Sequence, residues 1–200
     1  MIDLGLLREF LRNPTGVAAV TPSCTAISTL LSMVIPESGE PVVVELGAGT
    51  GACTDVIRHR LGGRGRHLAV EVNPTFAKLL SKRYQDVEVI RGDAKDLPMF
   101  LADQGITSAD VIISTLPWEA FAPLPTARPL LATLVESLSD GGVYTQVAYS
   151  WTRWAPPARR QLRQLQAGFE EVLISETIWR NVPPARAYVA RRPRSSRAPS

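Results

Sequence analysis

Three glycines and three acids at regular intervals are the residues of this sequence best suited to hold a charged ligand. The segment VVVELGAGTGACTDVI (42–57) is an apolar run with an acid at Glu45, glycines at 47, 49 and 51, and then a helix-like pattern. Glycine permits positive φ and lets a ligand approach the main chain without a Cβ in the way. The spacing is tighter than the dinucleotide pattern G-x-G-x-x-G, and no Gly-Lys-Ser/Thr follows as in a P-loop. Because Glu45 would repel a pyrophosphate, the bend suits a ligand with an ammonium group.

Two further acids could bind the rest of such a ligand. Glu71 ends the next apolar run, twenty residues after Gly51, where an acid can accept hydrogen bonds from ribose hydroxyls. Asp93 follows the run after that, where an adenine amino group could donate to it. The alternative is structural: Glu71 would cap a helix and Asp93 would shape a turn.

The elements that must position these residues alternate along the chain. Apolar runs predict buried strands at 42–45, 67–71, 87–91, 110–114 and 143–148. Helical periodicity predicts helices at 2–12, 21–34, 52–59, 77–84 and 129–138, the last ended by Gly141 and Gly142. Two β-rich runs, EEVLISETIW and ARAYVARR, are separated only by RNVPP and predict an antiparallel hairpin. We therefore expect an α/β fold with a Rossmann-like, seven-stranded, mostly parallel sheet, an antiparallel last strand and helices on both faces.

Length and composition favour one main domain with decorated ends. With 200 residues, of which 45% are hydrophobic, the chain can bury one sizeable core. We expect an N-terminal helical segment at 1–36, the main domain at 37–192 and a disordered basic tail at 193–200. No apolar run is long enough to span a bilayer, and no export signal is evident, so we expect a cytoplasmic protein. Cys24 and Cys53 lack metal-ligand spacing, so no metal site is predicted.

Charge adds a second expectation about partners. The net charge is +3, and the basic residues form clusters that would suit an anionic lipid surface or nucleic acid if they are not simply solvated. In the 2–12 helix, Leu7, Phe10 and Leu11 share one side, with Arg8 and Arg12 nearby. This helix could lie peripherally at the inner face of the membrane, or its apolar stripe could fold over the bound ligand as a lid.

Four motifs together resemble one enzyme family. The stretches VELGAGTGACT, AVEVNP, VIRGDAKDL and SDGGVY resemble class I S-adenosylmethionine-dependent methyltransferases over residues 40–150. The resemblance implies S-adenosyl-L-methionine as cofactor, with its methionine part at Glu45, Gly47 and Gly49, its ribose at Glu71 and its adenine at Asp93 and Ala94. The complete set of cofactor-binding residues that it implies is Glu45, Gly47, Ala48, Gly49, Gly51, Glu71, Val72, Asp93, Ala94 and Thr115.

Three other stretches indicate the methyl acceptor. FLRNPTGVAAVTPSCTAISTLL, ISTLPWEAF and WRNVPPARAYVARR resemble small bacterial phosphatidylethanolamine N-methyltransferases, which are similar to rRNA adenine dimethyltransferases. The resemblance implies a phospholipid amine as acceptor. Trp118 could lie against the cation, Tyr149 could hydrogen-bond the amine, and Arg180 could hold the phosphate. Alternatively, Trp118 is core, Tyr149 a surface residue at a strand end, and Arg180 a solvated turn charge.

One position departs from the nucleobase enzymes. These carry Asn before Leu-Pro-aromatic or Pro-Pro-aromatic, whereas this chain has Thr115 in TLPW. A hydroxyl lacks the paired recognition that an amide gives an adenine edge, so nucleic acid is disfavoured as a partner. Two other hypotheses remain: a soluble small-molecule methyltransferase of secondary metabolism, and a binding protein without catalytic activity.

Overall fold

The computed structural model describes residues 22–116, 129–150, 155–181 and 183–194. The predicted helix at 2–12 and Trp118 lie outside these ranges. Within them, no helix is both long enough and apolar enough to cross a membrane.

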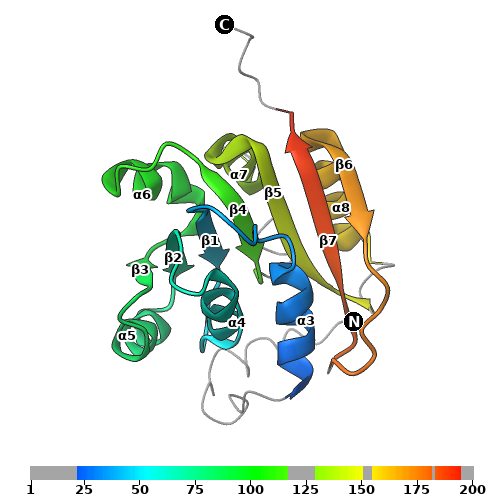
Figure 1. Ribbon diagram of the computed structural model, residues 1–200. Coiled ribbons are helices and arrows are strands. Elements are labelled where there is room, and N and C mark those ends of the chain that lie inside the picture. The colour runs from blue at the N-terminus through cyan, green and yellow to red at the C-terminus, as the bar shows by residue number, and fades with distance from the viewer. Residues whose placement is uncertain (1–21, 117–128, 151–154, 182, 195–200) are drawn as a thin grey trace, which may run out of the picture.

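A seven-stranded sheet forms the centre of the molecule. Its strands are β1 (Val42–Leu46), β2 (Arg66–Glu71), β3 (Glu88–Arg91), β4 (Ala109–Ser114), β5 (Leu138–Tyr149), β6 (Phe169–Ile174) and β7 (Ala185–Pro193). The spatial order is β3-β2-β1-β4-β5-β7-β6. The first five strands pair in parallel, and β7 lies antiparallel between β5 and β6. In Figure 1 the arrowheads of β1 and β4 point downward and that of β7 points upward, which confirms the predicted sheet.

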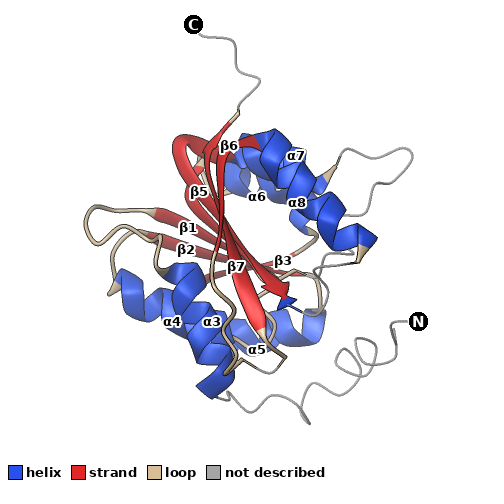
Figure 2. Ribbon diagram, turned by 90° about the vertical axis from the view of Figure 1, so that its right-hand side faces the viewer, coloured by secondary structure: helices blue, strands red, loops and turns tan. Residues whose placement is uncertain are grey.

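Helices cover both faces of this sheet. They are α3 (Pro22–Ser32), α4 (Ala52–Leu61), α5 (Pro74–Arg83), the 3-10 helix η1 (Ala94–Asp96), α6 (Leu97–Asp103), α7 (Leu130–Ser137) and α8 (Pro156–Gly168). Figure 2 shows α3, α4 and α5 on one face and α6, α7 and α8 on the other. Ile27, Leu31 and Ile35 are buried in the first layer, so the 22–36 stretch shares the core of the main domain.

Local sequence explains where the helices beside β1 and β2 begin and end. α4 is bounded by Gly51 and Gly62, both with positive φ, and the Gly62 amide donates to the Arg58 carbonyl at 3.0 Å. α5 begins earlier than periodicity predicts. The Asn73 side chain caps it by accepting from the Thr75 amide at 2.9 Å, and Pro74 occupies the first turn.

Other predicted boundaries were wrong or incomplete. β5 begins at Leu138, so Gly141 and Gly142 lie within a strand and do not separate a helix from one. The pairing with β4 shifts register there, and a Cβ at Gly142 would stand 2.8 Å from the Ser139 carbonyl oxygen, so the bulge requires glycine. Helices α6 and α8 were not predicted. β7 reaches Pro193, inside the segment assigned from sequence to the tail.

Candidate active site

The glycine bend leaves β1 between the carboxyl ends of β2 and β4. The Gly47 amide donates to the Val70 carbonyl at 2.9 Å, and the Thr115 amide donates to the Leu46 carbonyl at 3.0 Å. The Thr115 hydroxyl donates to the Gly47 carbonyl at 2.7 Å. Thr115 therefore holds the first turn of the bend in place.

The three positions of the bend need glycine for different reasons. All have positive φ, at 77° for Gly47, 56° for Gly49 and 92° for Gly51. A Cβ at position 47 would stand 3.0 Å from Leu116 Cδ2, and one at position 51 would stand 2.6 Å from the Tyr84 hydroxyl oxygen. At position 49 nothing lies nearer than the Gly47 carbonyl oxygen at 3.8 Å, so this backbone faces open space. Packing requires glycine at 47 and 51, whereas Gly49 leaves room for a ligand.

Glu71 ties the bend to the end of β2. Its carboxylate accepts from the Gly49 amide and from the Asn73 amide, each at 2.8 Å, and the residue is only 6% exposed. A carboxylate has about four acceptor sites, so two such bonds leave capacity for ligand hydroxyls. Asn73, and not Glu71, caps the following helix, so the alternative that Glu71 caps a helix was wrong.

Glu45 lies in the buried layer between β1 and α4. One carboxylate oxygen, Oε2, accepts from the Thr54 hydroxyl at 2.8 Å and lies 3.1 Å from His67 Nε2. The other oxygen, Oε1, is buried and has no hydrogen-bond partner among the described residues. Burial, followed by the charge of Glu45, raises the pKa of the Cys53 thiol, so this free cysteine remains protonated at neutral pH.

The third acid marks the end of β3. The Gly92 amide donates to the Glu71 carbonyl at 3.2 Å, which brings this segment beside β2. Asp93 accepts from the Lys95 amide at 3.0 Å and caps η1, while its side chain remains 52% exposed. Val72 is 68% exposed beside it, and Ala94 is buried in the core. The structure thus brings together the ends of β1, β2 and β3, as the sequence predicts.

The remaining predicted residues lie near the ends of β4 and β5. Tyr149 ends β5, is 39% exposed and pairs with Ala185, the first residue of β7. The Ser150 amide donates to the Pro184 carbonyl at 2.8 Å, which closes the same corner. Arg180 is exposed in the connection that leads into β7. These two residues therefore lie near the corner where the end of β5 meets the start of β7.

Sequence reasoning missed two buried side chains that support the site. Gln146 of β5 donates to the Leu116 carbonyl at 2.8 Å and so fixes the chain beside Thr115. The Tyr84 hydroxyl lies 3.1 Å from the Gly51 carbonyl and 2.9 Å from Asp55 Oδ1, to which it can donate. Burial and then the hydrogen bond to Asp55 raise the pKa of Tyr84. Each residue bonds to a segment about thirty positions away in the sequence, so no short motif could have revealed it.

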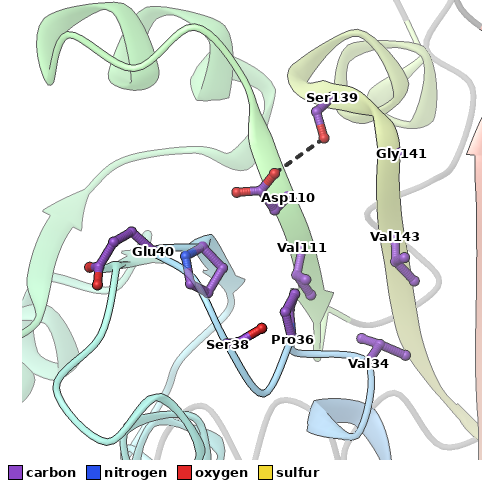
Figure 3. A pocket seen from close by; sticks show the side chains of 10 residues that line it. Val34, Pro36, Ser38, Glu40, Asp110, Val111, Ser139, Gly141 and Val143 are labelled. Atoms are coloured by element: carbon purple, nitrogen blue, oxygen red, sulfur yellow. Dashed lines mark hydrogen bonds between the residues drawn. The ribbon is translucent and has the colours of Figure 1, made fainter.

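A shallow hollow at the opposite edge of the sheet has a structural explanation (Figure 3). It is lined at the amino ends of β1 and β4 by residues that include Glu40 and Asp110. Asp110 accepts from the Val42 amide at 2.8 Å and from the Ser139 hydroxyl at 3.4 Å, and Glu40 accepts from the Gly65 amide at 2.6 Å. Both carboxylates serve the fold, so the glycine-lined edge is the candidate active site.

Comparisons with known proteins agree with this assignment. A family model described as a methyltransferase domain matches residues 43–142. An ornithine lipid N-methyltransferase of Singulisphaera acidiphila is 34% identical over 188 residues, covering 92% of this chain and 93% of that protein. A probable ribosomal RNA small subunit methyltransferase A of Thermococcus onnurineus is 35% identical over 91 residues, covering 44% of this chain and 29% of its own length.

Solved structures show the same fold. An O-methyltransferase from Bacillus cereus in complex with SAH has a TM-score of 0.67 at 15% identity, covering 94% of this chain and 89% of that one. Aeropyrum pernix fibrillarin with natively bound S-adenosyl-L-methionine has a TM-score of 0.59 at 19% identity, covering 84% and 76%. The chain belongs to the class I S-adenosylmethionine-dependent methyltransferases, with S-adenosylmethionine as its cofactor.

Proposed function

We propose that this enzyme transfers methyl groups from S-adenosylmethionine to the amine of a lipid headgroup at a membrane surface. The observation that carries the proposal is the relationship to an ornithine lipid N-methyltransferase, which extends over 92% of the chain. The ribosomal relative matches only 44% of it. Thr115 stands where nucleobase enzymes carry Asn, and its hydroxyl already donates to the Gly47 carbonyl, which further disfavours an adenine edge as acceptor.

The described residues fit the cofactor. Gly49 leaves its backbone open beside Glu71, whose carboxylate can still accept from ribose hydroxyls. The exposed side chains of Val72 and Asp93 offer an apolar face and an acceptor for adenine. The unpartnered Oε1 of Glu45 supplies negative charge beneath the bend, which suits the ammonium of the methionine part. In this assignment Ala48 and Gly51 would contribute backbone, and Ala94, buried at the start of η1, would line the adenine site.

Bound S-adenosylmethionine supplies a methyl group on a positively charged sulfur. An acceptor amine in line with that carbon–sulfur bond would take the methyl group, leave a neutral thioether behind and release one proton to water. The protein therefore needs to hold a neutral amine in position and admit solvent. Tyr149, exposed at the end of β5, would hydrogen-bond that amine, and Trp118, outside the described residues, would stabilise the resulting ammonium.

Arg180 suits an acceptor that carries a negative charge as well as an amine. It lies exposed on the acceptor side of the carboxyl edge. An ornithine lipid offers a carboxylate and phosphatidylethanolamine offers a phosphodiester, and a guanidinium binds either with two parallel hydrogen bonds. We place ornithine lipid first because of the relative, and phosphatidylethanolamine second.

Transfer of labelled methyl from S-adenosylmethionine tests the proposal. Vesicles containing ornithine lipid or phosphatidylethanolamine would be compared with a panel of soluble amines and phenols, and thin-layer chromatography would separate the methylated lipids. Glu71→Gln serves as the variant without cofactor binding. Label in either lipid supports the proposal and identifies the acceptor. Label in a soluble compound and none in lipid would overturn it and favour a small-molecule methyltransferase.

A further inference from the structure

A rigid turn holds one tryptophan in solvent beside the acceptor side of the site. The Asn181 amide donates to the Ile178 carbonyl at 3.2 Å, so Trp179 and Arg180 occupy the middle of a turn. Ile178 pairs with Ala185, its amide donating to the Ala185 carbonyl at 2.8 Å. Asn181 is 4% exposed, and its side-chain amide donates to the Pro183 carbonyl at 2.6 Å. Both ends of the turn are fixed, yet Trp179 is 77% exposed.

The edge strand β6 presents further apolar surface. Leu173 and Ile174, at its end, are 47% and 46% exposed, and they pair with Val189 and Tyr188 on β7. Because they are adjacent in the strand, their side chains point to opposite faces of the sheet. Ile174 shares its face with Val172, which packs against the core cluster that contains Leu165 of α8. Tryptophan in particular is favoured at the headgroup level of a bilayer, where its ring is partly apolar and its N–H remains wet.

The adjoining helix α8 supplies positive charge without internal partners. Its sequence, PPARRQLRQLQAG, contains three arginines and no acid. Arg159, Arg160 and Arg163 are exposed, and no hydrogen bond or ion pair joins their side chains to any other residue in the part of the chain that the structure describes. Arg159 and Arg160 lie in the first two turns, nearer the positive end of the helix dipole, where cations are not favoured, and Arg163 follows just past the middle of the helix. These three cations therefore gain no attractive charge contact within the described residues, and they suit contact with an external anionic surface.

Topology places both features at the active-site edge. Ala185 follows the turn and pairs with Tyr149 at the end of β5, and α8 begins seven residues after Tyr149. Figure 1 shows the β6–β7 connection, in orange, at the lower right, on the side toward which β1 and β4 point. A planar bilayer can meet a turn tip and a helix end that belong to the same edge.

We propose that Ile174 and Trp179, together with Arg159, Arg160 and Arg163 of α8, form an outer-edge surface that docks on an anionic lipid bilayer. Trp179 enters the headgroup layer, and the arginines bind lipid phosphates. Docking there sets the headgroup amine beside Tyr149. The inference rests on the proposed lipid acceptor for its purpose, although the docking itself can be measured separately.

Vesicle co-sedimentation of the full chain tests the surface. Phosphatidylcholine vesicles with and without phosphatidylglycerol would be titrated with the wild type, with Trp179→Ala, and with the triple variant Arg159→Gln, Arg160→Gln, Arg163→Gln. Basic residues near an anionic surface contribute about fivefold each, so the triple variant should bind anionic vesicles about 100-fold more weakly. Losing the buried part of one large aromatic should cost about tenfold.

Matched controls carry the same chemical changes elsewhere. Met99→Ala removes an exposed apolar side chain of α6, and Lys78→Gln with Lys82→Gln removes exposed charge from α5. Both should bind vesicles within about twofold of the wild type, because surface substitutions outside an interface usually change free energies by less than about 0.5 kcal/mol. Calorimetry with S-adenosylmethionine would confirm that every variant is folded.

The outcomes separate the surface from the proposed function. Weaker vesicle binding by the two surface variants alone, with unchanged methylation of a short-chain soluble aminolipid, supports docking through this edge. Vesicle binding equal to the wild type in both surface variants, or no vesicle binding by the wild type, overturns it. Binding of duplex RNA by these residues in place of vesicles would also overturn it. If the edge binds vesicles but no lipid becomes methylated, the surface stands and the lipid acceptor fails.

Discussion

The arginines beside β1, β2 and β3 differ from those of α8 in whether they have partners within the protein. At the β3–β2–β1 end, arginines are paired within the protein: Arg58 with Asp86 at 2.8 Å, Arg66 with Glu88 at 2.6 Å and Arg83 with Asp55 at 2.7 Å. On α8, beyond β5, the three arginines have no such partner among the described residues. At the same end of the sheet, Arg192 of β7 does pair with Glu170 and Glu171, at 3.6 Å each. The cations without a described partner at this end are therefore those of α8 and not those of the strands.

This contrast separates what the family shares from what is particular to this chain. The glycine bend and its three acids suit any class I methyltransferase, so they establish the cofactor and say nothing of the acceptor. The residues proposed to recognise the acceptor lie beyond β4, where Tyr149, Trp179 and the arginines of α8 are exposed. Mutations at the first end should therefore change cofactor binding, and mutations at the second should change acceptor delivery.

The largest expected effect is at Glu71. Glu71→Gln removes the charge that bonds the Gly49 amide and that is proposed to hold the ribose. Hydrogen bonds to a charged group contribute about 1.5–3 kcal/mol each, so we expect cofactor affinity to fall about 100-fold or more. Isothermal titration calorimetry with S-adenosylmethionine measures it. Glu88→Gln is the control, because Glu88 pairs with Arg66 away from the bend. If Glu71→Gln binds S-adenosylmethionine within threefold of the wild-type affinity, Glu71 does not bind the cofactor.

Two glycines of the bend should respond differently. Gly49→Ala and Gly51→Ala both place a side chain at positive φ, at a cost of about 1–2 kcal/mol. At position 51 the new Cβ also meets the Tyr84 hydroxyl, which adds about 1–3 kcal/mol. Calorimetric unfolding should therefore show the greater stability loss in Gly51→Ala, while Gly49→Ala should lose more cofactor affinity per kcal/mol of stability. Equal profiles for the two variants would contradict the division into packing and ligand glycines.

The cofactor half of the site could be predicted because its residues are close in sequence. Glu45, Gly47, Gly49 and Gly51 occupy one strand–turn–helix unit, and Glu71 and Asp93 follow the next two strands. Parallel strands with crossover helices bring such ends to one edge, so order along the chain predicts position in space. Periodicity also predicted the seven strands and the antiparallel β7.

Long-range supports could not be predicted in the same way. Tyr84 and Gln146 contact backbone carbonyls of segments distant in the chain, and the residues next to them in sequence give no sign of these contacts. Helix α8 was missed because Arg, Gln and Pro obscure a narrow apolar stripe of Ala158 and Leu165. Its unpaired arginines become informative only when the structure shows that other arginines are paired.

A smaller effect is expected at Tyr84. Tyr84→Phe removes the hydroxyl near the Gly51 carbonyl and Asp55 but keeps the ring that packs against Arg58 and Arg83. A hydrogen bond to a charged group such as the Asp55 carboxylate contributes about 1.5–3 kcal/mol, so the free energy of unfolding should fall by about that amount. Cofactor affinity should fall severalfold, since the glycine bend loses the contact between the Tyr84 hydroxyl and the Gly51 carbonyl. Full affinity at reduced stability would make Tyr84 a purely structural residue.

The smallest effect concerns the paired arginines themselves and depends on pH. The hydrogen bond from Arg58 lowers the pKa of Asp86, so folding is favoured when this carboxylate is charged. A carboxyl with a lowered folded pKa contributes stability above its unfolded pKa and loses it as pH falls through the folded value. The pair is exposed, and its contribution to the free energy of unfolding at pH 7 should be about 0.5 kcal/mol.

Urea unfolding should show Asp86→Asn less stable than the wild type at pH 7 and equal to it below the folded pKa. A difference that persists in acid would show that Asp86 stabilises the fold through its shape and not through its charge. The same comparison with Arg160→Gln on α8 should show no stability loss at either pH, because that arginine has no partner in the described part of the chain to lose.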